Sequence, residues 1–155
     1  MPEIIQDRII PQIIVDDGNA AMAFIKRAFH AEEVSRVMAK DGKKLMHGEV
    51  KIGGHLLFVS DEFDASEGGT CRSPKTLGGT GVRITLEVAN ADETAAAAVA
   101  AGARVTMPVQ DMFWGGRYGK IIDPFGHEWG INQQKRAMSD ADANDAAKKY
   151  LAERK

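Results

Sequence analysis

A histidine and a glutamate stand two positions apart, as His47 and Glu49, in the stretch LMHGEVKI. This stretch is predicted to be a β-strand, and a spacing of two places both side chains on one face. Such a pair can act as a general acid and base, or as two metal ligands that His127 would complete to a two-histidine, one-carboxylate iron site. The alternative is a structural hydrogen-bonded pair in a solvated cavity. The HxE spacing also occurs in zinc deaminases, which need a later cysteine pair, whereas this chain has only Cys71.

A second group of candidates surrounds a predicted hairpin in WGGRYGKIIDPFGHEWGINQ (114–133). Trp114 precedes two glycines, so its ring can stack on a flat ligand that comes close to the backbone. Its alternative role is a hydrophobic plug over a cavity or a dimer contact. Arg117 lies at the lip of the same hairpin and is the other candidate for ligand binding in this stretch.

Alternation along the flanking predicted strands adds polar candidates. In the strand that contains Arg83, the apolar side chains share one face, which leaves Arg83 on the other. Arg83 can clamp a carboxylate or phosphate, or it can form a salt bridge to Glu49 or Glu87. The same alternation places Gln12 in the first strand and Glu128 in the last on sheet faces that the helices leave open.

The bulk composition indicates an ordinary globular protein. The chain has 155 residues, of which 44% are hydrophobic and 27% charged, enough for one domain with its own core. Its formal net charge of −2 gives no basic surface, so we expect neither nucleic acid nor an anionic membrane as a partner. The N-terminus lacks a signal-peptide pattern, no apolar run is long enough to cross a bilayer, and a single cysteine suits a reducing compartment. We therefore expect a soluble, cytoplasmic protein.

The order of the predicted elements is the same in the two halves of the chain. Each half contains a strand, a helix and three further strands, and two such units enclose a cavity when they pair. The predicted fold class is therefore α+β, with one domain over residues 1–134 and a helical tail over 139–155. The first βαβββ module is expected over about 8–62, a loop or mobile linker over 63–80, and the second module over about 81–134.

Capping and turn residues set the expected boundaries of these elements. Asn19 is expected to cap the first helix, and Ser139 to cap the tail helix. Asp41 with Gly42 marks one hairpin turn, and the run DPFG at 123–126 marks another. The apolar face of the tail helix is small, so we expect this helix on the surface and not in the core.

The repeated βαβββ order resembles the vicinal oxygen chelate superfamily, which contains glyoxalases, bleomycin-resistance proteins and extradiol dioxygenases. The similarity is carried by IIPQIIVDDGNAAMAFIKRAF, by LMHGEVKIGGHLLFVSDE, and by VANADETAAAAVAAGARV with FWGGRYGKIIDPFGHEW. It extends up to about residue 134 and is closest to the PhnB-like branch. The resemblance implies two paired modules of the glyoxalase/bleomycin-resistance/dihydroxybiphenyl-dioxygenase-like fold, each a curved sheet around a pocket, and a homodimer.

Metal enzymes of this superfamily hold their ion at four points, on the first and last strand of each module. Carried over to this sequence, these positions fall near Ile10, Phe58, Arg83 and Gly130. None of these side chains binds a divalent metal, although a small shift of register brings in Gln12 or Glu128. The resemblance therefore implies a pocket without an obligatory metal or other cofactor, and a divalent metal is the alternative.

These features together predict a small-molecule-binding protein, which sequesters its ligand in the manner of bleomycin-resistance-like proteins. Its expected ligand-binding residues are Gln12, Phe58, Arg83, Trp114, Arg117 and Glu128. The alternative is an enzyme, either a glyoxalase-like lyase or isomerase or a dioxygenase, with His47 and Glu49 as catalytic residues. A third interpretation is a module without a ligand that acts through its dimer surface or its C-terminal helix.

Overall fold

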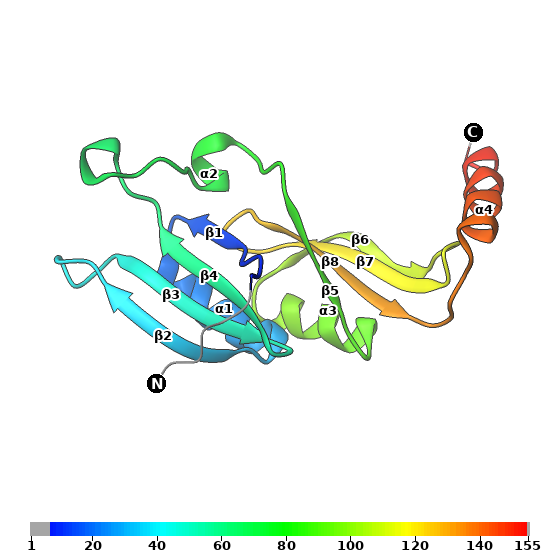
Figure 1. Cartoon of the computed structure of the whole chain (residues 1–155), viewed down its shortest axis with the longest axis horizontal. Helices are drawn as coiled ribbons and strands as arrows, with labels where there is room; N and C mark the ends of the chain where they lie inside the picture. Colours follow the sequence, from blue (N-terminus) through cyan, green and yellow to red (C-terminus); the bar gives the residue numbers. More distant parts are fainter. Residues whose placement is uncertain (1–6, 155) are drawn as a thin grey trace. The chain divides into compact units, whose positions relative to one another are not determined.

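The computed structural model describes residues 7–154, and Figure 1 shows the elements that they form. The chain divides between Gly79 and Thr80 into two compact units. Each unit contains one four-stranded sheet and one long helix packed on it. These features confirm the predicted α+β class, the two βαβββ modules and the C-terminal helix.

The first unit is built around a sheet with the strand order β1-β4-β3-β2. Strand β1 runs parallel to β4, and the other neighbours are antiparallel. The elements are β1 (Gln12–Val15), α1 (Gly18–Phe29), β2 (Glu32–Met38), β3 (Leu45–Ile52) and β4 (His55–Asp61). Helix α1 buries Met22, Phe24 and Ile25 against one face of the sheet, because its apolar residues recur at helical spacing.

Asp17, and not Asn19, caps helix α1, so the expected cap was wrong by two positions. The Asp17 side chain accepts a hydrogen bond from the Ala20 backbone N–H at 3.0 Å. Asn19 lies inside the helix, where its Oδ1 accepts a hydrogen bond from Arg36 Nη1. The earlier start is favoured by Asp61, whose carboxylate accepts hydrogen bonds from the Gly18 backbone N–H at 3.0 Å and from the Leu45 backbone N–H at 2.6 Å.

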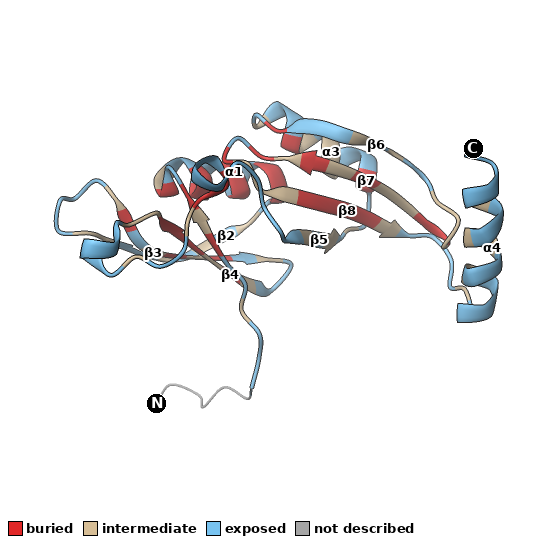
Figure 2. Cartoon of the chain, turned by 90° about the horizontal axis from the view of Figure 1, so that it is seen from above, coloured by how far each residue is buried: buried red, intermediate tan, exposed pale blue. Residues whose placement is uncertain are grey.

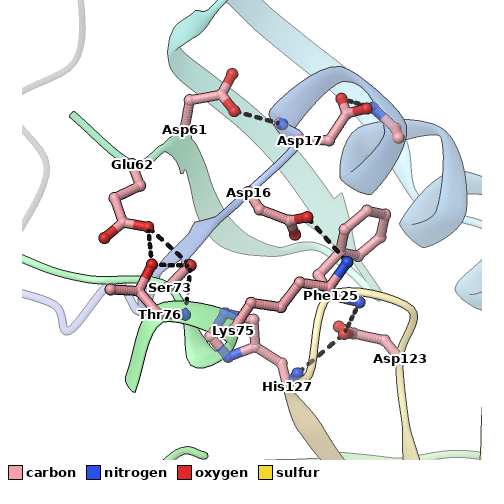
Figure 3. Close-up of polar contacts among 12 residues, drawn as sticks. Asp16, Asp17, Asp61, Glu62, Ser73, Lys75, Thr76, Asp123, Phe125 and His127 are labelled. Atoms are coloured by element: carbon pink, nitrogen blue, oxygen red, sulfur yellow. Dashed lines mark hydrogen bonds and ion pairs between the residues drawn. The ribbon is translucent and has the colours of Figure 1, made fainter. Parts of the chain in front are cut away.

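The segment expected to be a loop or mobile linker contains two short helices, η1 (Ala65–Glu67) and α2 (Pro74–Leu77). Ser73 caps α2 and is fully buried. Its hydroxyl donates to Glu62 Oε2 at 2.8 Å, and the Thr76 hydroxyl donates to the same oxygen at 2.7 Å (Figure 3). These two hydrogen bonds lower the pKa of Glu62 and attach α2 to the end of β4.

The second unit repeats the pattern with the strand order β5-β8-β7-β6. Strand β5 is parallel to β8, and the remaining pairs are antiparallel. The elements are β5 (Arg83–Glu87), α3 (Ala91–Ala100), β6 (Arg104–Asp111), β7 (Gly116–Ile122) and β8 (Glu128–Gln134). The core of this unit centres on Trp129, which is fully buried, with Ile121 and Ile131.

The turn between β7 and β8 is held by the carboxylate of Asp123. Its Oδ1 accepts the backbone N–H groups of Phe125 and His127, both at 2.9 Å (Figure 3), and its Oδ2 accepts Trp129 Nε1 at 2.9 Å. Burial raises the pKa of Asp123, whereas the three N–H donors favour its ionised form. The DPFG motif therefore forms the predicted turn and also fixes the core tryptophan.

Helix α4 (Asp140–Ala152) follows β8 and is capped by Ser139, whose hydroxyl accepts the Asp142 backbone N–H at 3.1 Å. Helix α4 contains no buried residue, in agreement with its predicted place on the surface (Figure 2). None of the helices within residues 7–154 combines the length and the apolarity that crossing a bilayer requires.

Candidate functional site

The sheet of the second unit has an open face that forms a groove. Helix α3 packs against β6, β7 and β8, and the groove, with a volume of about 610 Å³, lies on strands of the same sheet. Its lining combines aromatic, methionine, polar and charged side chains. These are Arg83, Thr85, Glu87, Met107, Met112, Phe113, Trp114, Tyr118, Lys120, Asn132, Tyr150 and Arg154.

Strand β5 gives the groove its polar edge. Arg83, Thr85 and Glu87 are exposed and line the groove, whereas Ile84 and Leu86, which alternate with them, are half-buried. A strand places successive side chains on opposite faces, so this arrangement follows directly from the sequence. The alternation that predicted an open position for Arg83 is therefore present in the structure.

Aromatic rings form one continuous wall of the groove. The ring centroid of Tyr118 lies 5.4 Å from that of Trp114, which in turn lies 5.1 Å from that of Phe113, and both contacts are edge-to-face. Phe113 reaches the ring of Tyr150 in α4, at 5.0 Å between centroids. Aromatic side chains in contact hold one another in place and offer flat, polarisable surface to a ring-shaped ligand.

Asn132 connects the aromatic wall to the polar edge. It is 6% exposed and lies on β8, where its Nδ2 donates to Glu87 Oε1 at 2.9 Å. Its Oδ1 accepts a hydrogen bond from Trp114 Nε1 at 3.4 Å. Asn132 thus fixes the orientation of the Trp114 indole and of the Glu87 carboxylate together.

Two glycines allow the rings to lie close to the strands. A Cβ atom at Gly130 would lie 2.6 Å from the Tyr118 hydroxyl and 2.8 Å from Thr85 Oγ1. A Cβ atom at Gly116 would lie 2.6 Å from Trp114 Nε1. The glycines beside aromatic residues in the last hairpin are therefore required by the packing of the wall.

Arg83 and Glu128 are direct cross-strand partners on the parallel pair β5–β8, and Arg83 Nε donates to Glu128 Oε1. The hydrogen bond to Glu128 raises the pKa of Arg83. The residue opposite Arg83 is therefore Glu128, the shifted alternative, and not Gly130, whose partner on β5 is Thr85. The position carried over from the metal enzymes thus holds a guanidinium, a permanent cation that repels a divalent metal.

The other side chains in the described part of the chain that could donate to a metal ion are also not arranged to hold one. Among residues 7–154, no group of three or more His, Cys, Asp or Glu side chains is arranged to hold one. In the first unit, the cross-strand partner of Phe58 on β1 is Gln12. This pair provides a single weak amide ligand and an aromatic ring.

Arg117 is not brought to the groove. It lies on β7 next to Tyr118, and its guanidinium binds Asp92 at the start of α3, with Nε–Oδ2 at 2.6 Å and Nη2–Oδ1 at 2.9 Å. A weaker bond joins Arg117 Nη1 to Asp111 Oδ1 at 3.3 Å. These contacts raise the pKa of Arg117 and lower the pKa of Asp92, and they direct the guanidinium toward the helix side of the sheet.

The first unit brings together the other predicted site residues on β1, β3 and β4. His47 Nε2 lies 2.9 Å from Glu49 Oε1, and the side chains are 32% and 25% exposed, respectively. The imidazole contacts the ring of Phe58 edge-to-face, at 4.6 Å between centroids. Gln12 faces Phe58 in the strand register and donates a long hydrogen bond of 3.4 Å to Ser60 Oγ. A hydrogen-bonded histidine and carboxylate can exchange a proton with a bound molecule.

Several lining residues were not predicted from the sequence. Tyr118 and Lys120 occupy β7, where strand alternation was not applied to the sequence but could have found them. Asn132 lies on β8, on the face that alternation assigned to Glu128, but it was not selected as a site residue. Tyr150 lies in α4 and Arg154 follows just past its end, and no sequence motif connects either residue to the groove.

Two βαβββ modules, each with a sheet that is open on one face, define the class of fold that the sequence resemblance predicted. The sequence model of the Glyoxalase/Bleomycin resistance protein/Dioxygenase superfamily matches residues 6–131. The chain belongs to this superfamily. Helix α4 lies outside the matched residues.

Proteins similar to this chain include a sequence relative and solved structures of the same fold. Uncharacterized protein Mb0911c of Mycobacterium bovis is 38% identical over 135 residues, which cover 87% of this chain and 88% of that protein. The crystal structure of TioX from Micromonospora sp. ML1 matches with a TM-score of 0.66 at 24% identity, over 83% of this chain and 99% of TioX. FosX, the genomically encoded fosfomycin resistance protein of Listeria monocytogenes, matches with a TM-score of 0.60 at 19% identity, over 90% of this chain and 99% of FosX. The two structures share the fold with this chain.

Proposed function

We propose that this protein binds a small molecule in the groove of its second unit, without a bound metal. The observation that carries this proposal is the combination of a preformed aromatic wall with polar groups already oriented by their neighbours. Trp114 and Tyr118 supply the flat apolar surface, and Arg83 and Asn132 supply the polar edge. Small-molecule sites have this composition, with mostly apolar walls and a few fixed polar groups.

Sequestration of the ligand is the form of binding that we propose, in the PhnB-like, bleomycin-resistance-like branch of the superfamily. FosX, which has the same fold, is a fosfomycin resistance protein. We also propose that the protein works as a homodimer in the cytoplasm, and membership of the superfamily supports the dimer. Of the predicted site residues, Arg83 and Trp114 line the proposed groove, and Glu128 pairs with Arg83. Gln12 and Phe58 would contact a ligand on the first unit.

The proposal is tested by titrating the protein with small aromatic compounds while following tryptophan fluorescence. The chain has two tryptophans, and Trp129 is fully buried, so a ligand in the groove should quench Trp114 selectively. In Trp114→Phe the same compounds should leave the remaining emission unchanged. Saturable quenching that persists in Trp114→Phe would place the binding site elsewhere and contradict the proposal.

A second candidate function is favoured by one observation, the hydrogen bond of 2.9 Å between His47 and Glu49. In this alternative the pair acts as general base and acid in a glyoxalase-like isomerisation or lyase reaction, or supports a dioxygenase reaction. His47→Gln and Glu49→Gln should each abolish a turnover found in a substrate screen while circular dichroism stays unchanged. Unchanged turnover in both variants would rule out this pair as the catalytic residues.

A further inference from the structure

Helix α4 reaches the groove although it is an addition to the matched family region. Most of its residues are exposed and none is buried (Figure 2). Its side of the groove is formed by Tyr150 and by Arg154, which follows just past the end of the helix. The ring contact between Tyr150 and Phe113 joins α4 to the wall of the groove.

That contact extends the aromatic wall by one ring and one cation. The Tyr150 ring lies at 5.0 Å from Phe113, inclined by 42°, and the Arg154 guanidinium stands 4.3 Å above the Tyr150 ring centroid. A guanidinium over an aromatic ring is attracted by the negative face of the ring quadrupole. Its N–H groups stay available for hydrogen bonds to other groups. Arg154 is thus oriented at the end of the wall with donors free for another group.

The charges around the groove are not balanced. The charge of Arg83 is matched by Glu128, and Glu87 accepts a hydrogen bond from Asn132. Lys120 and Arg154 also line the groove, and neither forms an ion pair with any residue between 7 and 154. Glu87 keeps its negative charge, because its partner Asn132 is a neutral amide, so Lys120 and Arg154 leave the groove with an excess of one positive charge. This excess favours a ligand that carries negative charge.

We propose that Tyr150 and Arg154 of the C-terminal segment complete the ligand site, and that the ligand is a flat aromatic molecule with an anionic group. The aromatic wall holds the ring, and Arg154, with Lys120, pairs with the anion. This inference rests on the proposed function, because it assigns residues and a ligand class to the same groove. Tyr150 and Arg154 are binding residues whose loss leaves the sheet and its core untouched.

The test compares two fluorescent probes that differ in one group. 1-Anilinonaphthalene-8-sulfonate carries an anion, and N-phenyl-1-naphthylamine is the same ring system without it. Wild-type protein should bind the sulfonate more tightly. Arg154→Gln should weaken sulfonate binding by about threefold to fivefold, as for a partly exposed ion pair, and leave the neutral probe unchanged. Tyr150→Leu should weaken both probes.

Lys148→Gln is the matched control, because it removes one positive charge from the exposed side of the same helix. It should change the affinity for either probe less than twofold. Trp114→Ala tests the groove itself and should weaken both probes by at least tenfold, since a ring contact and its buried area are lost. Circular dichroism and size-exclusion chromatography of every variant establish that fold and oligomeric state are retained.

The outcomes separate the two proposals. If Trp114→Ala weakens binding while Arg154→Gln matches Lys148→Gln and Tyr150→Leu has no effect, the groove binds ligand and the role of the C-terminal segment is overturned. Equal affinity of the wild type for both probes overturns the anionic ligand class. If Trp114→Ala has no effect, or if neither probe binds saturably, the groove proposal fails, and the inference fails with it.

Discussion

Arg83 and Glu128 face each other across the parallel strands β5 and β8, and their side chains form an ion pair at the edge of the groove. In the metal enzymes of this superfamily, corresponding positions on the first and last strands of a module supply metal ligands. Here the carboxylate that could bind a metal is already neutralised by an arginine. We therefore expect the polar edge of the groove to contact a ligand through hydrogen bonds and charge.

Metal removal should have no effect on ligand binding. EDTA, and separately added Zn²⁺ or Mn²⁺, should leave the affinity for 1-anilinonaphthalene-8-sulfonate unchanged, because the Arg83 guanidinium repels a cation beside Glu128. Fluorescence titration measures the affinity, and native mass spectrometry measures bound metal. Arg83→Glu, which places a second carboxylate opposite Glu128, is the comparison and should take up more metal than the wild type. A wild-type protein that binds ligand only with metal would contradict this account.

Gly130→Ala should weaken ligand binding by displacing Tyr118. The new methyl group would lie 2.6 Å from the Tyr118 hydroxyl, so the ring must move away from β8. We expect a loss of about 1–2 kcal/mol in the free energy of unfolding, as for a tight overpacked site. Chemical denaturation and probe titration measure the two effects. Gly79→Ala, which adds a methyl group in open space, is the control and should change neither.

Asp123→Asn should destabilise the second unit. The amide keeps one oxygen for the Phe125 and His127 N–H groups, but its NH₂ group then faces the Trp129 indole N–H, so one buried donor loses its acceptor. The expected loss is about 1–3 kcal/mol in the free energy of unfolding. Urea denaturation followed by tryptophan fluorescence measures it. Asp145→Asn on the exposed side of α4 should have no effect, and equal stability of both variants would show that the turn does not depend on this carboxylate.

The first unit should lose stability in acid through Glu33. Hydrogen bonds from Arg36 at 2.8 Å and from Lys26 at 2.9 Å lower the pKa of Glu33 from 4.5 to about 2. Because the folded-state pKa is depressed, this contribution is fully present above pH 4.5 and is lost as the pH falls toward 2. Glu33→Gln should therefore lower the free energy of unfolding by about 1 kcal/mol at pH 7, given the partial exposure of the group.

Comparing urea denaturation of wild type and Glu33→Gln across this pH range checks the prediction. The difference between the two proteins should shrink as the pH falls from 4.5 to 2. Glu32→Gln, at an exposed neighbouring position, should show no such difference. A constant difference between wild type and Glu33→Gln at every pH would mean that the ion pairs are not its source.

The fold could be predicted from the sequence because each element carries a local signal. Period-two alternation identified β5 and placed Arg83 on its open face, and the DPFG motif located the turn before β8. The cap of α1 was missed because Asp17 and Asn19 are both good capping residues. What decides between them is the distant carboxylate of Asp61, which accepts the Gly18 N–H and has no local sequence signal.

The candidate site was predictable in part for the same reason. Trp114 and Arg83 stand out by residue type and alternation, and both line the groove. The partner of Arg83 depends on the parallel register of β5 and β8, which sequence spacing alone does not give. Arg117 was expected at the groove but binds Asp92. Its partner depends on the position of α3, which carries Asp92 in its first turn. Strand alternation cannot predict the position of Tyr150, because this residue lies in α4. Its position depends on the path of the chain between β8 and α4.

The most direct test of the central claim uses the indole N–H signals of the two tryptophans in a ¹H–¹⁵N correlation spectrum. Trp114 Nε1 donates to Asn132 in the groove, whereas Trp129 Nε1 donates to the buried Asp123 carboxylate. Titration with 1-anilinonaphthalene-8-sulfonate should shift the Trp114 signal saturably and leave the Trp129 signal in place, with Trp114→Phe assigning the two. Saturable binding that leaves the Trp114 signal unshifted would contradict the proposal that the groove of the second unit is the ligand site.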